Sequence, residues 1–343
     1  MSRALRLRLA IYLGLPAAAL LALWLGSVRM PGHSFRGPLP PLTAADSDAI
    51  RRLQADVTML ADGIGDRDAI TAHAGLERAS QWLEGALGVI AQATVERQEY
   101  RVAGRAVRKL STTIGRGTGG AFVLVGAHYD AIVDTPGADD NASGVAGTLE
   151  LARRLRARRP DCEVRVALFT NEEPPFFWSD SMGSLVYARA MAARGERPSA
   201  VFVLESIRTF SDTPGSQRYP PVLGWFYPDT AHFIAFVGDL RSRPLVRQSI
   251  ADFRAVATVP SAASAAPPQF PGVGWSDHWS FWQVGVPAVM VTGTAPYRND
   301  HYHEDTDVPA RLDYGRMARV VTGMEHVVRA ACDRAARPVS AAP

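Results

Sequence analysis

The sequence predicts an α/β fold: a three-layer sandwich with a mixed, largely parallel central sheet flanked by helices, preceded by one N-terminal transmembrane helix. From about residue 94, short apolar or alternating runs take turns with helical patterns, which is the order of elements in such sheets. The run AFVLVGA at 121–127 is continuously apolar, as expected of a strand buried on both faces. Leu9 to Val28 are twenty residues without a charge, enough for a membrane-spanning helix.

Residues 1–29 are therefore expected to be a membrane anchor or a signal segment. Arg3, Arg6 and Arg8 precede the apolar run, and this distribution favours a cytoplasmic amino terminus with the rest of the chain exported. A cleaved signal peptide is the alternative. The anchor is favoured because the run is long and no clear small-x-small cleavage site follows it. The expected location is the cell membrane with an extracytoplasmic domain, or a secreted or periplasmic one after cleavage.

The rest of the chain predicts one large domain. Residues 30–46 are rich in proline and glycine and predict a linker, followed by a globular domain over 47–338 and a tail over 339–343. The hydrophobic fraction of 47% and charged fraction of 21% are ordinary for a globular protein. The net charge is +3 and the arginines are scattered, so no nucleic-acid partner is expected. The oligomeric state stays open.

The domain is expected to begin with helices from Asp46 or Ser47 to about 62 and over about 72–90. The elements expected after them are strands over 94–102 and 106–115, a strand over 121–127, a helix over 143–158, a strand over 163–170, a helix over 184–194, strands over 200–205 and 287–293, and a helix from about 311 to 335. The stretches 206–228 and 259–275 interrupt this alternation and are expected to be loops over a functional site.

Histidine and acidic side chains follow four of the predicted strands. In strand order they are His128 and Asp130, then Glu172 and Glu173, then Glu205, and finally His301 and His303. In open α/β sheets, ligands lie outside the carboxyl ends of the strands. Carboxylates gathered there repel one another, and burying them unpaired costs several kcal/mol each. One or two divalent cations would remove this cost, and imidazole with carboxylate suits zinc, with manganese and cobalt as alternatives.

Two further acids belong to the same region. Asp139 and Asp140 precede Asn-Ala-Ser-Gly, a pattern compatible with a helix cap, with a metal ligand, or with one of each. Asp130 lies two residues after His128 and, in an extended segment, points the same way. Asp130 is therefore expected to accept the second ring N–H of His128, as carboxylates often do for metal-bound histidines.

Four blocks of sequence occur in the order typical of a known family. They are GAHYDA, GADDNASGVA, TNEEPPFF with MGS, and SDHWSFW with GVPAVMVT and YRNDHYHEDTDVPARLDY. Between about residues 121 and 315 the chain resembles the di-zinc exopeptidases typified by bacterial leucine aminopeptidase and glutamate carboxypeptidase II. The resemblance implies two bound zinc ions, a peptide substrate and hydrolysis by a metal-bridging water.

The resemblance also implies roles for individual residues. The implied metal ligands are His128 and Glu205 for one zinc, Glu173 and His303 for the other, and Asp140 as the bridge. Glu172 would be the general base, Asp130 would support His128, and Asp307 would support His303. His303 is preferred to His301 because it follows Tyr302, as in the family's Tyr-His block. Glu205 stands where many relatives have aspartate, and His278 of the SDHW block is interpreted as part of the pocket.

The expected activity is that of a zinc exopeptidase, most simply an aminopeptidase, although the sequence does not exclude a carboxypeptidase. The alternatives are a glutaminyl cyclase-like acyltransferase with one zinc and a non-catalytic binding domain. Arg208, Arg218 and Arg298 could hold a substrate carboxylate, but solvent-exposed charges are the favoured interpretation. Export would permit a disulfide between Cys162 and Cys332, yet two buried free thiols are favoured.

Overall fold

The computed structural model describes residues 24–117, 121–221 and 223–336, with five isolated positions before them (12, 14, 15, 18 and 21). Half of the apolar run from Leu9 to Val28 therefore lies outside the described residues. Within the part that is described, no helix combines the length and the apolar character needed to cross a membrane.

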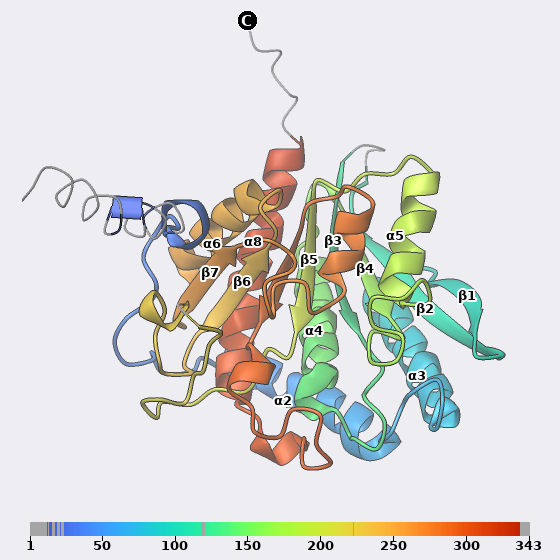
Figure 1. The fold of residues 1–343 in the computed structure, drawn as a ribbon. Coiled ribbons are helices and arrows are strands. Elements are labelled where there is room, and N and C mark those ends of the chain that lie inside the picture. Colours follow the sequence, from blue (N-terminus) through green and yellow to red (C-terminus); the bar gives the residue numbers. More distant parts are fainter. Residues whose placement is uncertain are drawn as a thin grey trace, which may run out of the picture.

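A mixed sheet runs through the centre of the molecule (Figure 1). Among the described residues it has eight strands, in the order β1-β2-β4-β3-β5-β8-β6-β7. The strands are β1 (Glu96–Val102), β2 (Arg105–Gly115), β3 (Phe122–His128), β4 (Glu163–Phe169), β5 (Ala200–Glu205), β6 (Ile234–Gly238), β7 (Ser261–Ala265) and β8 (Ala288–Thr292). Strands β4, β3, β5 and β8 are parallel neighbours, whereas β2 and β6 run antiparallel to β4 and β8. The predicted mixed sheet is confirmed.

Helices cover both faces of the sheet, which gives three layers (Figure 1). The helices are α2 (Ala44–Thr58), α3 (His73–Ala91), α4 (Gly144–Ala157), α5 (Gly183–Ala193), α6 (Arg243–Val256), α7 (His278–Gln283) and α8 (Tyr314–Ala336). Successive strand residues face opposite sides of a sheet. In β5, Phe202 and Leu204 accordingly pack into the core that contains α2, α3, α4, α6 and α8. Val201 and Val203 pack instead against α5 and α7.

The stretch between residues 229 and 283 contains the elements that the sequence did not indicate. They are β6, α6, β7 and α7, and β7 lies inside the segment 259–275 that was expected to be a loop. The β7 sequence, SAASA, has low intrinsic strand propensity. It is a strand because its backbone pairs in parallel with β6, a tertiary cause that no local pattern reveals.

Cys162, just before β4, forms a disulfide with Cys332 of α8. The preference for two free thiols was therefore wrong. The two residues are 170 positions apart in sequence, yet their Cα atoms are 5.3 Å apart, which is within the range that a disulfide requires. That proximity arises from packing α8 under the sheet and is not visible in the spacing of the cysteines.

Residues 24–40, called the docked segment below, are bound to the domain through their backbone. Arg243 of α6 donates to the carbonyls of Leu25 (2.7 Å) and Gly26, and Arg254 donates to that of Pro31 (2.8 Å). Arg319 of α8 donates to the carbonyl of Pro40. Much of the expected linker therefore lies along α6 and α8.

Candidate metal centre and active site

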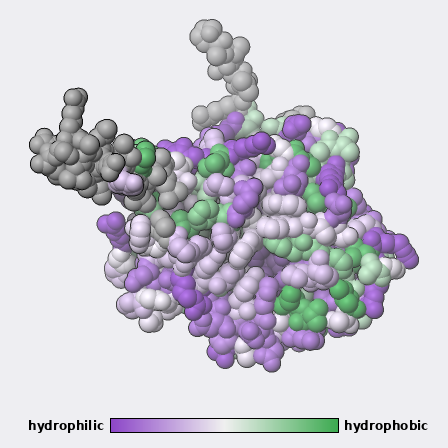
Figure 2. All heavy atoms as spheres, in the orientation of Figure 1, coloured by the Kyte–Doolittle hydropathy of each residue, from purple (hydrophilic) through white to green (hydrophobic). Residues whose placement is uncertain are grey.

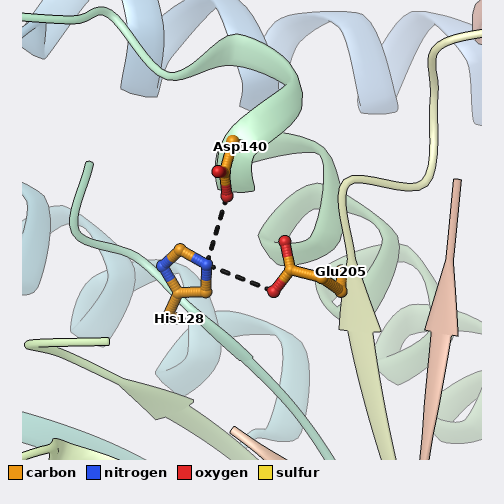
Figure 3. A group of neighbouring side chains, drawn as sticks. All are labelled: His128, Asp140 and Glu205. Carbon is orange, nitrogen blue, oxygen red and sulfur yellow. Dashed lines mark ion pairs between the residues drawn. The ribbon is translucent and has the colours of Figure 1, made fainter. Parts of the chain in front are cut away.

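The carboxyl ends of three neighbouring parallel strands carry the candidate site. His128 is the last residue of β3 and Glu205 the last of β5, and these strands are adjacent in the sheet. Glu172 and Glu173 follow β4, the other neighbour of β3. Asp140 comes from the turn that precedes α4, and it joins His128 and Glu205 at the centre of the site (Figure 3).

His128 forms one half of the cluster. Its Nε2 atom lies 3.3 Å from Asp140 Oδ1 and 3.3 Å from Glu205 Oε2 (Figure 3). The ring is fully buried. The hydroxyls of Ser206 and Ser276 donate to the Glu205 carboxylate at 2.8 and 2.6 Å, so that this side chain is fixed beside the imidazole.

His303 forms the other half. Its Nε2 atom lies 3.1 Å from Asp140 Oδ2 and 3.3 Å from Glu173 Oε2. The two oxygens of Asp140 therefore face different histidines, Oδ1 toward His128 and Oδ2 toward His303. A carboxylate placed in this way is positioned to bridge two cations, one on the Glu205 side and one on the Glu173 side.

Glu172 lies at the edge of the same cluster. Its Oε2 atom is 3.8 Å from His128 Nε2, farther than the carboxylates of Asp140 and Glu205. Burial raises the pKa of Glu172 well above its ordinary value; His128 opposes this shift, and the negative charges of Glu173 and Glu205 add to it. Its greater distance from the imidazole sets it apart from the carboxylates of Asp140 and Glu205.

Asp130 and Asp307 contact the residues of the cluster from outside it. Asp130 Oδ1 is 3.5 Å from His128 Nδ1, and Asp130 Oδ2 accepts the backbone N–H of Glu173 at 3.1 Å. Asp307 was expected to support His303. Its carboxylate instead accepts the backbone N–H groups of Asp139 (3.0 Å) and Asp140 (3.1 Å), and none of its hydrogen bonds among the described residues goes to His303. Asp307 thus holds the turn that carries the bridging carboxylate.

Arg67 holds the other side of that turn and was not indicated by the sequence. It is fully buried, and its guanidinium donates to the carbonyls of Tyr129 (2.8 Å), Pro136 (2.5 Å) and Gly137 (2.7 Å). Burial lowers its pKa to about 10, against the opposing effect of Asp130, so it remains a cation at neutral pH. It fixes the loop between His128 and Asp140 from a position 61 residues earlier in the chain.

Tyr302 and Asp277 are two more site residues that were missed. The ring of Tyr302 stacks on His303 with centroids 3.8 Å apart. Burial, with the charges of Asp140 and Glu173, raises the Tyr302 pKa far above its ordinary value, so its hydroxyl stays a donor. Asp277 is fully buried, and neither of its carboxylate oxygens has a hydrogen-bond partner among the described residues. Tyr302 directly precedes an assigned ligand, which was the available signal.

The remaining candidates lie elsewhere. His301 is paired with Thr306 Oγ1 at 2.7 Å, outside the cluster. His278 is buried and bonds to the Val273 carbonyl, and burial lowers its pKa to about 4. Of the three arginines, Arg218 is exposed and paired with Asp300.

Arg208 and Arg298 are both buried, so the interpretation as solvent charges was wrong for these two. Arg208 bonds to the Leu312 carbonyl at 2.7 Å, and Arg298 bonds to that of Phe233 at 2.7 Å. Each arginine thus ties a loop of the domain to a backbone carbonyl, and Arg298 also donates to the side chains of Gln217 and Thr294.

The cluster contains three overlapping groups of side chains whose donor atoms are close enough to hold a metal ion. Donor atoms within 4.8 Å of one another come from His128, Asp140 and Glu205, from Asp140, Glu173 and His303, and from His128, Glu172 and Glu173. Within the described part of the chain, the buried atoms without a hydrogen-bond partner include both ring nitrogens of His128, Asp140 Oδ1 and Glu173 Oε1. Burial alone would lower the His128 pKa, but Glu205 and Glu172 raise it well above its ordinary value. A donor set of imidazole and carboxylate fits zinc.

Comparisons with known proteins relate the chain to a peptidase family. The model of the family described as Peptidase family M28 matches residues 111–328. The Escherichia coli K12 protein YfbL is 38% identical over 283 residues, which cover 80% of this chain and 85% of YfbL.

Two solved structures share the fold. A zinc aminopeptidase from Bacillus subtilis superimposes with a TM-score of 0.64 at 13% identity, covering 83% of this chain and 95% of that one. A glutaminyl cyclase from Porphyromonas gingivalis gives a TM-score of 0.61 at 19% identity, covering 82% and 97%.

Proposed function

We propose that this chain, which belongs to peptidase family M28, is a zinc-dependent exopeptidase that removes residues from the amino terminus of peptides. The observation that carries the proposal is the placement of Asp140, with one carboxylate oxygen beside each of two histidines. Glu205 and Glu173 complete a triad on either side. The similarity to a solved zinc aminopeptidase supports the choice of metal and activity.

Five side chains would hold the two zinc ions. His128 and Glu205 would hold one zinc ion, His303 and Glu173 the other, and Asp140 would contact both. When bound, the ions supply Lewis acidity, which polarises the scissile carbonyl and lowers the pKa of a water molecule toward ~7.

Glu172 would act as general base and then as general acid. It is buried, and its carboxylate lies 3.8 Å from His128 Nε2, which supports a role beside the attacking water. It would take the proton of that water and deliver it to the leaving amine. A general base must be ionised, and the positive charge of His128 and of the bound cations would favour the carboxylate form of Glu172. The Tyr302 hydroxyl, kept protonated by its surroundings, would donate to the carbonyl oxygen as negative charge develops.

Export of the domain is part of the proposal. The disulfide between Cys162 and Cys332 supports an oxidising compartment. The apolar run from Leu9 to Val28 and the arginines before it support a membrane anchor with the domain outside the cytoplasm.

The test combines metal content with activity. Purified chain would be assayed on L-aminoacyl p-nitroanilides and on carboxy-terminal reporters, as isolated, after chelation and after zinc is restored. We expect two zinc ions per chain and activity on the aminoacyl reporters that is lost and regained with zinc. Glu172→Gln should lower kcat at least ~100-fold with zinc retained, whereas the exposed control Glu304→Gln should change neither.

A glutaminyl cyclase-like activity is the second candidate, favoured by the similarity to the Porphyromonas enzyme. One zinc ion per chain, with cyclisation of amino-terminal glutaminyl peptides and no hydrolysis, would replace the proposal by this alternative.

A further inference from the structure

A group of three arginines, called the basic patch below, lies where the docked segment meets α6. Arg29 of the segment and Arg243 and Arg247 of α6 line a hollow of about 530 Å³. Arg243 and Arg247 are four residues apart and therefore lie on the same side of the helix. The flank formed by α6 and β7 is opposite the flank of α3 and β1 (Figure 1), and β7 and β1 are the two edge strands of the sheet. The basic patch thus belongs to one edge of the molecule.

No acidic side chain neutralises the basic patch. Among the described residues, none of its three guanidiniums has a carboxylate oxygen within 4.0 Å, and the residues outside that description include no Asp or Glu. The exposed Arg218, by contrast, is paired with Asp300 at 3.0 Å. Residues 24–40 and 240–251 contain five arginines and no acidic residue, although the whole chain has 37 basic and 34 acidic side chains. The excess of positive charge is therefore a local property of this surface.

The hydrogen bonds of the basic patch hold its guanidiniums without removing their charge. Arg243 donates to the backbone carbonyls of Leu25, at 2.7 Å, and of Gly26. Arg247 donates to the backbone carbonyl of Arg29 at 2.8 Å. These acceptors are neutral, and a guanidinium has five N–H groups, so both arginines keep donors for a further partner. Because the donors of arginine match two oxygens of a phosphate, the basic patch is preorganised for a partner that carries phosphate groups.

Two partly exposed apolar residues adjoin the basic patch. Trp24 and Leu25 are 39% and 41% exposed, and the guanidinium of Arg29 lies 5.6 Å from the centre of the Trp24 ring. Tryptophan and arginine together are typical of the boundary between lipid and water. On the face drawn in Figure 2, outside the grey atoms, hydrophobic residues form only small separate groups among hydrophilic ones. That face offers no broad apolar area to a bilayer, so attraction to a membrane has to come mainly from charge.

We propose that the basic patch binds the headgroups of anionic phospholipids and thereby holds the flank of α6 and β7 against the membrane surface. This inference rests on the proposed membrane anchor, because the uncharged run that begins at Leu9 ends at Val28, directly before Arg29. Each basic side chain near an anionic surface favours the attached state about fivefold, so three arginines favour it on the order of 100-fold. The Glu205 strand, three strand positions from β7, stays away from the lipid in this orientation.

The position of the flank can be measured on the full chain in vesicles. The two cysteines of the chain form a disulfide, so Gln248→Cys, on the exposed side of α6, introduces a single thiol for a fluorophore. The vesicles contain a headgroup-linked quencher and consist of phosphatidylcholine, alone or mixed with phosphatidylglycerol. We expect quenching several-fold stronger in the anionic vesicles. A fluorophore at Val89→Cys of α3, which is 78% exposed on the opposite flank, should be quenched weakly in both.

Substitutions separate charge from the docking of the segment. The triple variant Arg29→Gln, Arg243→Gln and Arg247→Gln should reduce quenching in anionic vesicles to the level in neutral ones. Lysine at the same three positions keeps the charge with fewer donors and should preserve the quenching. Raising the ionic strength to about 0.5 M shortens the Debye length to about 4 Å and should weaken it. The matched control removes the same charge from exposed positions at the other edge of the sheet and should behave as wild type: Arg101→Gln, Arg105→Gln and Arg116→Gln.

Several results would overturn the inference. They are equal quenching in neutral and anionic vesicles, loss of quenching in the lysine variant, and full quenching in the glutamine variant. Displacement of the flank by inorganic phosphate at constant ionic strength would identify a site for free anions instead. A chain that floats with neither kind of vesicle contradicts the membrane anchor and removes the basic patch proposal with it. Hydrolysis and metal content are measured apart from these experiments, so a failure of the exopeptidase function is distinguishable from a failure here.

Discussion

Lys109, the only lysine of the chain, should destabilise the fold at neutral pH. It lies in β2 and is 2% exposed, and its amine has no hydrogen-bond partner among the described residues. The ring of Tyr187 is 5.1 Å away. Burial, with a smaller contribution from Arg194, lowers the pKa of this amine from 10.5 to about 6.

The size and sign of the effect follow from linkage. Between about pH 6 and pH 10.5 the unfolded chain binds more protons at this residue than the folded chain, so stability rises with pH in this window. Each pKa unit is worth about 1.4 kcal/mol. At pH 7 the amine is mostly neutral in the fold and protonated in the unfolded chain, which costs roughly 5 kcal/mol, and at pH 9 the cost falls to roughly 2 kcal/mol.

Lys109→Met keeps the length of the side chain and removes the titration. We expect it to raise the free energy of unfolding by about 5 kcal/mol at pH 7 and about 2 kcal/mol at pH 9. Urea unfolding of the full chain at both pH values, followed by circular dichroism, measures this. Arg105→Met, an exposed cation at the start of the same strand, is the control and should show no such gain. A destabilised Lys109→Met, or an equal gain at both pH values, would refute the reasoning.

Three further predictions concern the site and its frame. Asp307→Asn should weaken zinc binding about 10- to 100-fold, measured by competition with a chelator, because its carboxylate holds the backbone of the Asp140 turn; unchanged affinity would contradict this. Arg67→Met should lower the free energy of unfolding by about 3 kcal/mol, since several buried carbonyls lose their donor. Thermal unfolding measures this loss, and an unchanged Tm would contradict the role of Arg67 in holding the loop before Asp140. Reducing the Cys162–Cys332 disulfide should cost about 3–5 kcal/mol for a bridge that spans 170 residues, so equal Tm values with and without reductant would be evidence against that contribution.

The fold was predictable wherever one strand or helix carries its own hydrophobic pattern. The apolar runs that became β3, β4, β5 and β8 have that property, and so does the long amphipathic α8. The strand β7 does not, because alanine and serine acquire strand structure there only through pairing with β6. The disulfide depends on the distance between α8 and the start of β4, which is likewise a property of the assembled molecule.

The site was predictable to the extent that strand ends can be located. His128 and Glu205 end neighbouring strands, so their proximity at one edge of the sheet could be predicted from the strands alone, without any knowledge of the loops. Asp307 was misassigned because its partner is a backbone segment about 167 residues earlier. Nothing in the sequence predicted that Arg67 is buried beside the site, since a lone arginine after a helix is ordinarily a surface charge.

The docked segment determines where any preceding part of the chain departs from the domain. Arg243, Arg254 and Arg319 bind its backbone carbonyls, and one of its side chains adds a further contact. Ser34 Oγ accepts the backbone N–H of Ser261, the first residue of β7. Since β7 is three strand positions from β5, that path lies about 14 Å across the sheet from the Glu205 strand. The residues ahead of Trp24 would accordingly leave the domain beside α6 and the edge strand β7, away from the Glu205 strand.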